Sequence, residues 1–186
     1  MKKVISAMAV VAVCFSAATS ATTLPDAAGV IDISGTVTDR NLNQCQIKLD
    51  KQLVNLTSSA NDLIEQGQNG TDIQQIVFSV SSTAQLSQCD KDIWDGKVAV
   101  KFVGTYDSAD GTGFANTAVG ENAATGVGIG LFNYDKTPFD ASKPYNVPGE
   151  TNMASKVLGL QLIKLKGQTV KTGAVSGNIT FQVERL

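Results

Sequence analysis

Histidine is absent from the 186 residues of this chain, and aromatic residues make up only 6% of it. Without histidine there is no Ser-His-Asp or Cys-His nucleophile, and no His-bearing zinc, copper or iron site. Charged residues are also few, at 17%, and the formal net charge is −2. The chain therefore lacks the basic stripe that nucleic-acid binding requires. We predict a protein that is not an enzyme and uses neither a metal nor a cofactor.

The first residues have the layout of a secretory signal peptide. Two lysines precede an apolar stretch, Val4 to Phe15, which is followed by small residues up to Ala21. The stretch is shorter than the roughly 20 residues of a transmembrane helix. We predict cleavage after Ala21 and export from the cytoplasm. A lipoprotein anchor at Cys14 is the alternative, and the branched Val13 before it disfavours that interpretation.

Removal of residues 1–21 leaves two cysteines, Cys45 and Cys89. Two cysteines in an exported chain have one intramolecular pairing, so we predict a disulfide between them. It would close a loop of about 44 residues, which contributes on the order of 4 kcal/mol in the loop-entropy model.

Apolar residues recur at every second position along most of the chain, which indicates β-strands. Turn pairs such as Asn69-Gly70 and Asp95-Gly96 separate the segments. This pattern predicts an all-β, antiparallel sandwich in one domain. Residues 57–68 would allow one helical turn capped by Ser58 or Ser59, and residues 106–125 form a connection without periodicity. The alternating segments are 27–37, 47–53, 76–80, 98–102, 127–131, 158–162 and 175–183.

The two ends of the mature chain are unusual. The last alternating strand runs to the final residue, with no polar tail. At the other end, residues 22–33 are apolar and contain glycine, where a mature terminus is usually polar and frayed. This segment is either an ordinary edge strand of its own sheet or a strand meant for another chain.

Several motifs, in order, resemble the pilin subunits of chaperone–usher fimbriae of the type 1-like class. Each motif is weak alone, but their order and spacing together with the single disulfide are specific. The resemblance runs the whole mature chain, and it is carried by Gly29-Val-Ile-Asp-Ile-Ser-Gly35, Leu86-Ser-Gln-Cys89-Asp90, Val98-Ala-Val-Lys-Phe102, Gly126-Val-Gly-Ile-Gly-Leu131 and Asn178-Ile-Thr-Phe-Gln-Val183.

The resemblance implies an incomplete immunoglobulin-like sandwich that is completed by a donated strand. It divides the chain into a signal peptide (1–21), a donor-strand extension (22–33) and a pilin domain (34–186). A periplasmic chaperone would fill the open groove first, and the extension of the next subunit would replace it. An outer-membrane usher would help to build a head-to-tail fimbria on the cell surface that contributes to bacterial adhesion. Such a groove, left open, would expose apolar surface and unpaired backbone groups, at a cost to the lone subunit.

The resemblance also assigns residues. Donor-strand side chains would be the odd-numbered ones, with Gly29 in a shallow pocket, and the C-terminal strand would face the chaperone. Arg185 replaces the family's usual penultimate tyrosine, and Lys164 replaces an aromatic in the preceding strand. The assigned donor residues are Pro25, Ala27, Gly29, Ile31 and Ile33, and the chaperone-facing residues are Gly173, Ile179, Phe181 and Val183.

Other functions were weighed against this one. Asp107, Asp110 and Gly111 lack the 12-residue pattern of a calcium loop, so a plain turn is favoured. Asp92 near Trp94 is the nearest candidate for sugar hydrolysis, and a turn beside a packed tryptophan explains it as well. A secreted carbohydrate-binding sandwich, or a minor or adaptor subunit at a fimbrial tip, remains the alternative function. The sequence does not separate a major from a minor subunit.

Overall fold

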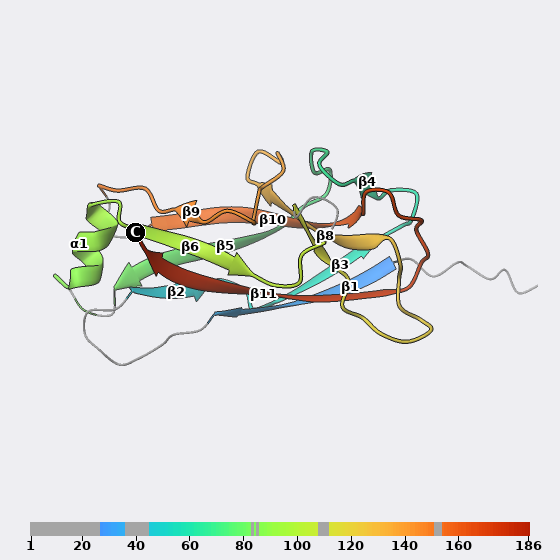
Figure 1. The fold of residues 1–186 in the computed structure, drawn as a ribbon, viewed down its shortest axis with the longest axis horizontal. Helices are drawn as coiled ribbons and strands as arrows, with labels where there is room; N and C mark the ends of the chain where they lie inside the picture. The colour runs from blue at the N-terminus through green and yellow to red at the C-terminus, as the bar shows by residue number, and fades with distance from the viewer. Residues whose placement is uncertain (1–26, 36–44, 83, 85, 108–111, 151–153) are drawn as a thin grey trace, which may run out of the picture.

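The structure is a computed structural model that describes residues 27–35, 45–82, 84, 86–107, 112–150 and 154–186. The predicted signal peptide and Pro25 lie outside these residues. Strands dominate the described part, with one short helix, so the all-β prediction is confirmed (Figure 1). The elements are β1 (Ala27–Gly35), β2 (Cys45–Leu49), β3 (Leu53–Ser58), β4 (Ile64–Glu65), β5 (Gln74–Ser82), α1 (Gln88–Trp94), β6 (Val98–Val103), β7 (Gly113–Ala115), β8 (Val127–Asn133), β9 (Tyr145–Asn146), β10 (Ala154–Lys164) and β11 (Ala174–Arg185).

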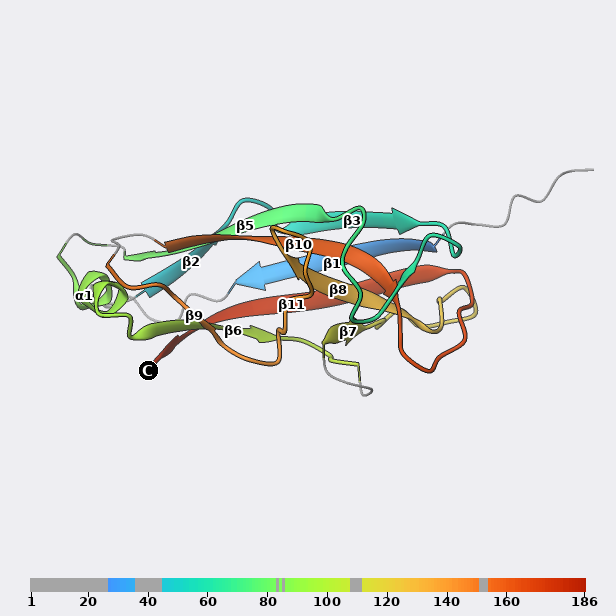
Figure 2. The same cartoon turned by 90° about the horizontal axis from the view of Figure 1, so that it is seen from above.

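Two sheets pack face to face as a sandwich (Figure 2). One has the order β3-β1-β11-β6-β9, and the other has the order β2-β5-β10-β8-β7, with β4 paired to β10. Every segment that alternates in the sequence contains a strand. Alternation places one side of each strand in the space between the sheets.

The core between the sheets is built from these inward side chains. Phe78 of β5 contacts Phe102 of β6 and Phe181 of β11, with ring centroids 6.0 and 5.4 Å apart. Tyr145 joins them in an edge-on contact with Phe78 at 5.8 Å. Edge-on geometry is a favourable arrangement of aromatic rings. These four aromatic residues thus pack together where the two sheets meet.

The segment 47–53 was expected to be one strand, but it forms parts of two. β2 ends at Leu49 and pairs with β5, whereas β3 begins at Leu53 and pairs with β1 in the other sheet. Asp50 makes the crossing possible, because its carboxylate accepts from the Val77 amide at 2.8 Å and its own amide donates to Val77 at 3.0 Å. These two hydrogen bonds hold the backbone at the point where the chain changes sheet.

The helix lies elsewhere than predicted. Residues 57–68 contain the end of β3, a turn and β4, so the expected helical turn is wrong. The helix is α1, and Ser87 caps it: the Ser87 hydroxyl accepts from the Asp90 amide, and the Asp90 carboxylate accepts from the Ser87 amide. A helix of seven residues has only about two turns, too few to show a period of 3.6 in its apolar residues. The capping box is the local sequence signal that indicates this helix.

The connection 106–125 also holds more structure than its sequence predicts. Within it, β7 pairs with β8, and a Cβ atom at Gly113 would lie 3.0 Å from the Ile163 side chain. Close packing there favours glycine. With glycine at position 113, β7 lacks the apolar alternation by which a strand is predicted from sequence. Asp107 is buried and accepts from the Gln168 side chain at 3.2 Å, whereas Asp110 and Gly111 lie outside the described residues.

Candidate functional site: the groove between β3 and β11

The N-terminal strand β1 lies inside a sheet, between β3 and β11. It runs parallel to β11, with Ile31 opposite Gly177 and Ile33 opposite Ile179. It runs antiparallel to β3, with Gly29 opposite Leu56. Without β1 these two strands would border an open groove in the sheet, because neither pairs directly with the other. The groove is therefore a site for one extended segment.

The odd-numbered side of β1 faces the core, as the alternation predicts. Ile31 is 0% exposed and Ile33 is 1% exposed, whereas Val30 on the opposite side is 47% exposed and Asp32 is exposed as well. Ala27 pairs with Ser58 at the start of the strand. Burial of each isoleucine contributes roughly 1.5–3 kcal/mol. Between Gly29 and Ile33, the apolar face of β1 thus fills the groove.

Gly29 occupies the shallow part of the groove. A Cβ atom built on it would lie 3.0 Å from Leu162 Cδ2 and 3.3 Å from Val175 Cβ. These contacts leave room for glycine and little more. A larger side chain at position 29 would have to displace the side chains of β10 and β11 below it.

The occupant of the groove in this structure is the chain's own N-terminal segment. The two interpretations left open by the sequence were an edge strand of its own sheet and a strand for another chain. β1 belongs to its own sheet, but it is an interior strand and not an edge strand. Its insertion into a neighbour remains a prediction, as do the donor roles of Pro25, Ala27, Gly29, Ile31 and Ile33.

The C-terminal strand β11 forms the other wall of the groove. Ile179 and Phe181 are fully buried and Val183 is half-buried, so the expected alternation holds. Gly173, directly before β11, has φ +156° and lies against the backbone of Asn122 and Ala124. A side chain there would collide with this backbone. Contact of these residues with a chaperone remains a prediction.

The predicted disulfide is present. Cys45 and Cys89 are bonded, with Cα atoms 5.2 Å apart. The bond joins the start of β2 to α1, at the end of the sandwich where Figure 1 also shows the C-terminus. The helix is therefore fixed to the point where the N-terminal segment joins the body of the protein.

The two residues that depart from the family's pattern both form ion pairs. Arg185 Nε lies 3.3 Å from Asp92 Oδ2 of α1, and Lys164 Nζ lies 2.6 Å from Glu65 Oε1 of β4. Asp92 lies within α1 and not in a turn. The nearby Trp94 side chain is 51% exposed, so it is not packed in the core. The interpretation of Asp92 and Trp94 as a turn beside a packed tryptophan is wrong.

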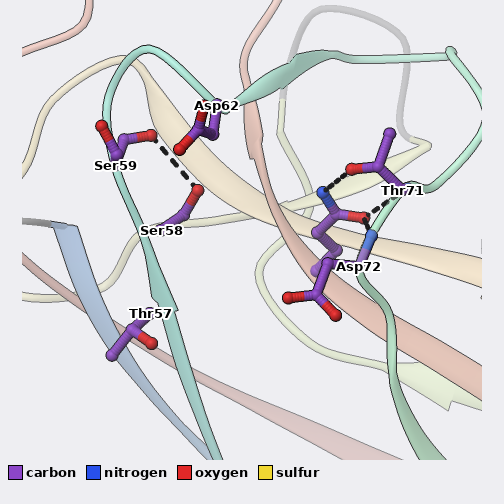
Figure 3. A pocket seen from close by; sticks show the side chains of 7 residues that line it. Thr57, Ser58, Ser59, Asp62, Thr71 and Asp72 are labelled. Carbon is purple, nitrogen blue, oxygen red and sulfur yellow. Dashed lines mark hydrogen bonds between the residues drawn. The ribbon is translucent and has the colours of Figure 1, made fainter.

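Two open hollows on the surface are alternative candidate sites. The first, of about 460 Å³, lies between β3, the loop before β5 and β10, and seven polar residues line it (Figure 3). The buried amide of Gln161 accepts from the Thr71 and Asp72 amides at 2.9 and 3.1 Å and donates to the Thr71 hydroxyl at 2.9 Å. These hydrogen bonds hold the loop before β5 against β10. The lining residues, none aromatic, are Thr57, Ser58, Ser59, Asp62, Thr71, Asp72 and Gln161.

The second hollow, of about 450 Å³, includes Tyr134 and Lys156. Lys156 Nζ lies 4.7 Å from the centroid of the Tyr145 ring and donates to Asn133 Oδ1 at 3.1 Å. Burial lowers the pKa of Lys156 and raises the pKa of Tyr145. The lysine is thus committed to internal contacts. Within the described residues there is no cluster of three metal-ligating side chains and no helix long and apolar enough to cross a membrane.

Comparison with known protein families identifies the family of this chain. A family model described as fimbrial protein matches residues 31–184, so the chain belongs to the fimbrial protein family and is a structural subunit of a fimbria. Membership of this family implies interaction with other pilin subunits in a polymer and a place in a surface fimbrium. No curated protein sequence matches the chain.

The solved structures similar to this chain include a pilus rod subunit, a fimbria protein and a tip adhesin. The P pilus rod subunit PapA is 14% identical with a TM-score of 0.49, over 82% of this chain and 100% of that one. An antigen and type I fimbria protein of Burkholderia pseudomallei is 17% identical with a TM-score of 0.42, over 86% and 91%. The CupB6 tip adhesin from Pseudomonas aeruginosa is 14% identical with a TM-score of 0.38, over 86% of this chain and 41% of that one.

Proposed function

We propose that this fimbrial subunit polymerises by donor-strand exchange, with residues 22–33 as the donated extension and residues 34–186 as the pilin domain. The observation that supports this is the position of β1. It occupies a groove between β3 and β11. Its covalent connection to β2 and the rest of the pilin domain runs through residues 36–44. A strand held in this way can be replaced by the same segment of another copy, which is a low-cost route to association.

Repetition of this exchange produces a fibre. Each subunit offers one groove and one extension, so the contact is heterologous and does not close on itself. Backbone hydrogen bonds supply affinity along the inserted strand, and the pockets for Gly29, Ile31 and Ile33 supply specificity. The adhesive contribution of the chain follows from its place in the surface fibre.

Export and assembly would require helpers. The N-terminal signal peptide directs the chain to the periplasm. A subunit whose β1 is not in its groove exposes the apolar residues that β1 covers, a hazard for aggregation. We propose that a periplasmic chaperone covers this groove along β11, at Gly173, Ile179, Phe181 and Val183. An outer-membrane usher then passes the subunit to the growing fibre.

The test uses Gly29→Leu beside Val30→Leu. Both place a leucine on β1, but position 29 faces the shallow pocket and position 30 faces solvent. Overpacking at position 29 costs about 1–3 kcal/mol or more. We expect Gly29→Leu to abolish surface fibres and to leave chaperone-bound subunit in the periplasm, whereas Val30→Leu forms fibres normally. Equal fibre yield for both variants would show that this segment is not the inserted strand.

A mixing experiment tests the two roles separately. A Gly29→Leu subunit keeps its own groove and can accept a strand, but it cannot donate one. Added in small amounts to the wild-type chain, it should end growing fibres and shorten them, as measured by electron microscopy. The Val30→Leu subunit should be incorporated without shortening.

A further inference from the structure

The α1 end of the sandwich presents apolar side chains to solvent from a rigid frame. Trp94, the single tryptophan of the chain, is 51% exposed, and Leu86 is 99% exposed. Leu86 directly precedes Ser87, the N-cap of α1, and Trp94 is the last residue of α1. Leu186 is also exposed, and its amide donates to the Lys97 carbonyl at 2.9 Å, directly after α1. We call Leu86, Trp94 and Leu186 the α1-end surface.

The surroundings hold this surface in place. Cys89 of α1 is bonded to Cys45, and Asp92 of α1 is paired with Arg185 at the end of β11. The Trp94 carbonyl accepts from the Glu150 amide at 2.9 Å. The exposure of Trp94 is therefore a property of the folded helix and not of a frayed end.

Leu86 has an uncommon conformation as well as full exposure. Its φ is 56°, in the left-handed region that leucine seldom adopts. Such a conformation costs on the order of 1–3 kcal/mol and is often found where a contact uses it. No side chain of the described part of this chain covers Leu86. The conformation presents an apolar side chain outward, as a contact with another molecule would require.

The chain itself indicates which molecule this is. Residues 36–44 connect β1 to Cys45, and Cys45 is bonded to α1. Ten peptide links span at most about 35 Å. When β1 enters the groove of a neighbour, the C-terminal end of that groove-bound strand therefore lies within about 35 Å of the α1 end of the donor. This is true for either direction of the inserted strand, because the link leaves the donor at Cys45 in both cases.

We infer that the α1-end surface docks onto the neighbouring copy that receives β1. The inference rests on the proposed strand exchange and adds a second contact to it. Strand exchange by itself replaces one buried β1 with another. It therefore gains little free energy relative to a monomer whose own β1 fills its groove. Burial of a tryptophan and two leucines at the junction provides an additional apolar gain that only the fibre has.

Trp94 is a direct probe, because no other tryptophan contributes to the emission. Acrylamide quenching is measured on the monomeric mature chain and on fibres made from it. We expect the quenching constant to fall about twofold or more in the fibre as the half-exposed ring is covered, with a shift of emission to shorter wavelength. An unchanged constant in fibres that Gly29→Leu abolishes would overturn the docking inference and leave strand exchange standing. Fibres that form regardless of Gly29→Leu would overturn both.

A pair of variants locates the contact. Leu86→Ser removes the side chain beside the N-terminus of α1, and Tyr134→Ser removes an exposed aromatic from the turn after β8. In fibres of Leu86→Ser, the quenching of Trp94 should rise toward the monomer value. Fibres of Tyr134→Ser should match the wild type. Protection of Trp94 that is the same in Leu86→Ser and wild-type fibres would show that Leu86 and Trp94 do not share a docked surface.

Discussion

Arg185 Nε lies 3.3 Å from Asp92 Oδ2, and this ion pair ties the end of the C-terminal strand to α1. The Asp92 side chain is only 11% exposed and also accepts from Gln88 Nε2 at 2.7 Å. Arg185 therefore joins β11 to α1 at the position where the resemblance in the sequence implied a tyrosine. An ion pair thus anchors this end of β11 to α1.

Arg185→Ala should lower the free energy of unfolding by about 1–3 kcal/mol, because a largely buried carboxylate loses its cation. Lys143→Ala is the control, since its pair with Asp140 is exposed and should contribute less than about 1 kcal/mol. Urea unfolding of the purified monomer measures both. Equal effects would show that burial of Asp92 does not strengthen its pair.

Ile31→Ala should destabilise the monomer by about 2–5 kcal/mol, because it leaves a cavity in the filled groove. Val30→Ala, on the exposed face of the same strand, should change stability by less than about 0.5 kcal/mol. Thermal or urea unfolding of the monomer distinguishes the two. Similar, small effects would mean that β1 leaves the groove of the lone subunit in solution, and that the groove is then open.

Free-thiol labelling of the denatured, unreduced mature chain should give no signal, because Cys45 and Cys89 are bonded. The unprocessed chain should give one thiol per molecule, since Cys14 lies in the predicted signal peptide. Replacement of both bonded cysteines by alanine should cost about 4 kcal/mol of stability by the loop-entropy argument. Two reactive thiols in the mature chain would contradict the bond.

Acid should weaken the protein in part through Asp140. Hydrogen bonds from Ser142, and then Lys143, hold the pKa of Asp140 below its usual value of 3.8. A lowered pKa in the folded state contributes stability that is present above pH 3.8 and is lost as the pH falls through the folded value. Asp140→Asn should therefore be less stable than wild type at neutral pH, and the difference should vanish in stronger acid.

Ser142→Ala should reproduce most of the effect of Asp140→Asn, because the serine makes the largest contribution to this pKa shift. The effect should stay below about 1 kcal/mol, since the Asp140 side chain is partly exposed and its charge is screened by solvent. Unfolding measured across a series of pH values tests both variants. A difference from wild type that persists below the folded pKa would point to lost packing in place of charge.

Local patterns were sufficient to predict much of the architecture. The side chains of a strand alternate with a period of two, so the buried faces around Phe78, Val100 and Ile129 can be found without coordinates. The pairing of Cys45 with Cys89 followed from the number of cysteines. Elements that depend on few residues were missed. α1 depends on a capping box at Ser87, and β7 depends on glycine packing at Gly113.

Alternation is a property of one strand, so the sequence of Ala27–Gly35 is enough to show that its odd-numbered side is apolar and would fill a groove. That this groove lies between β3 and β11 of the same chain, with β1 parallel to β11, is known from the folded structure and not from the sequence. Strand pairing joins residues that are far apart in sequence. Its backbone hydrogen bonds are nearly the same for any partner, so register and direction are set by the packing of Gly29, Ile31 and Ile33 against side chains that local patterns do not specify.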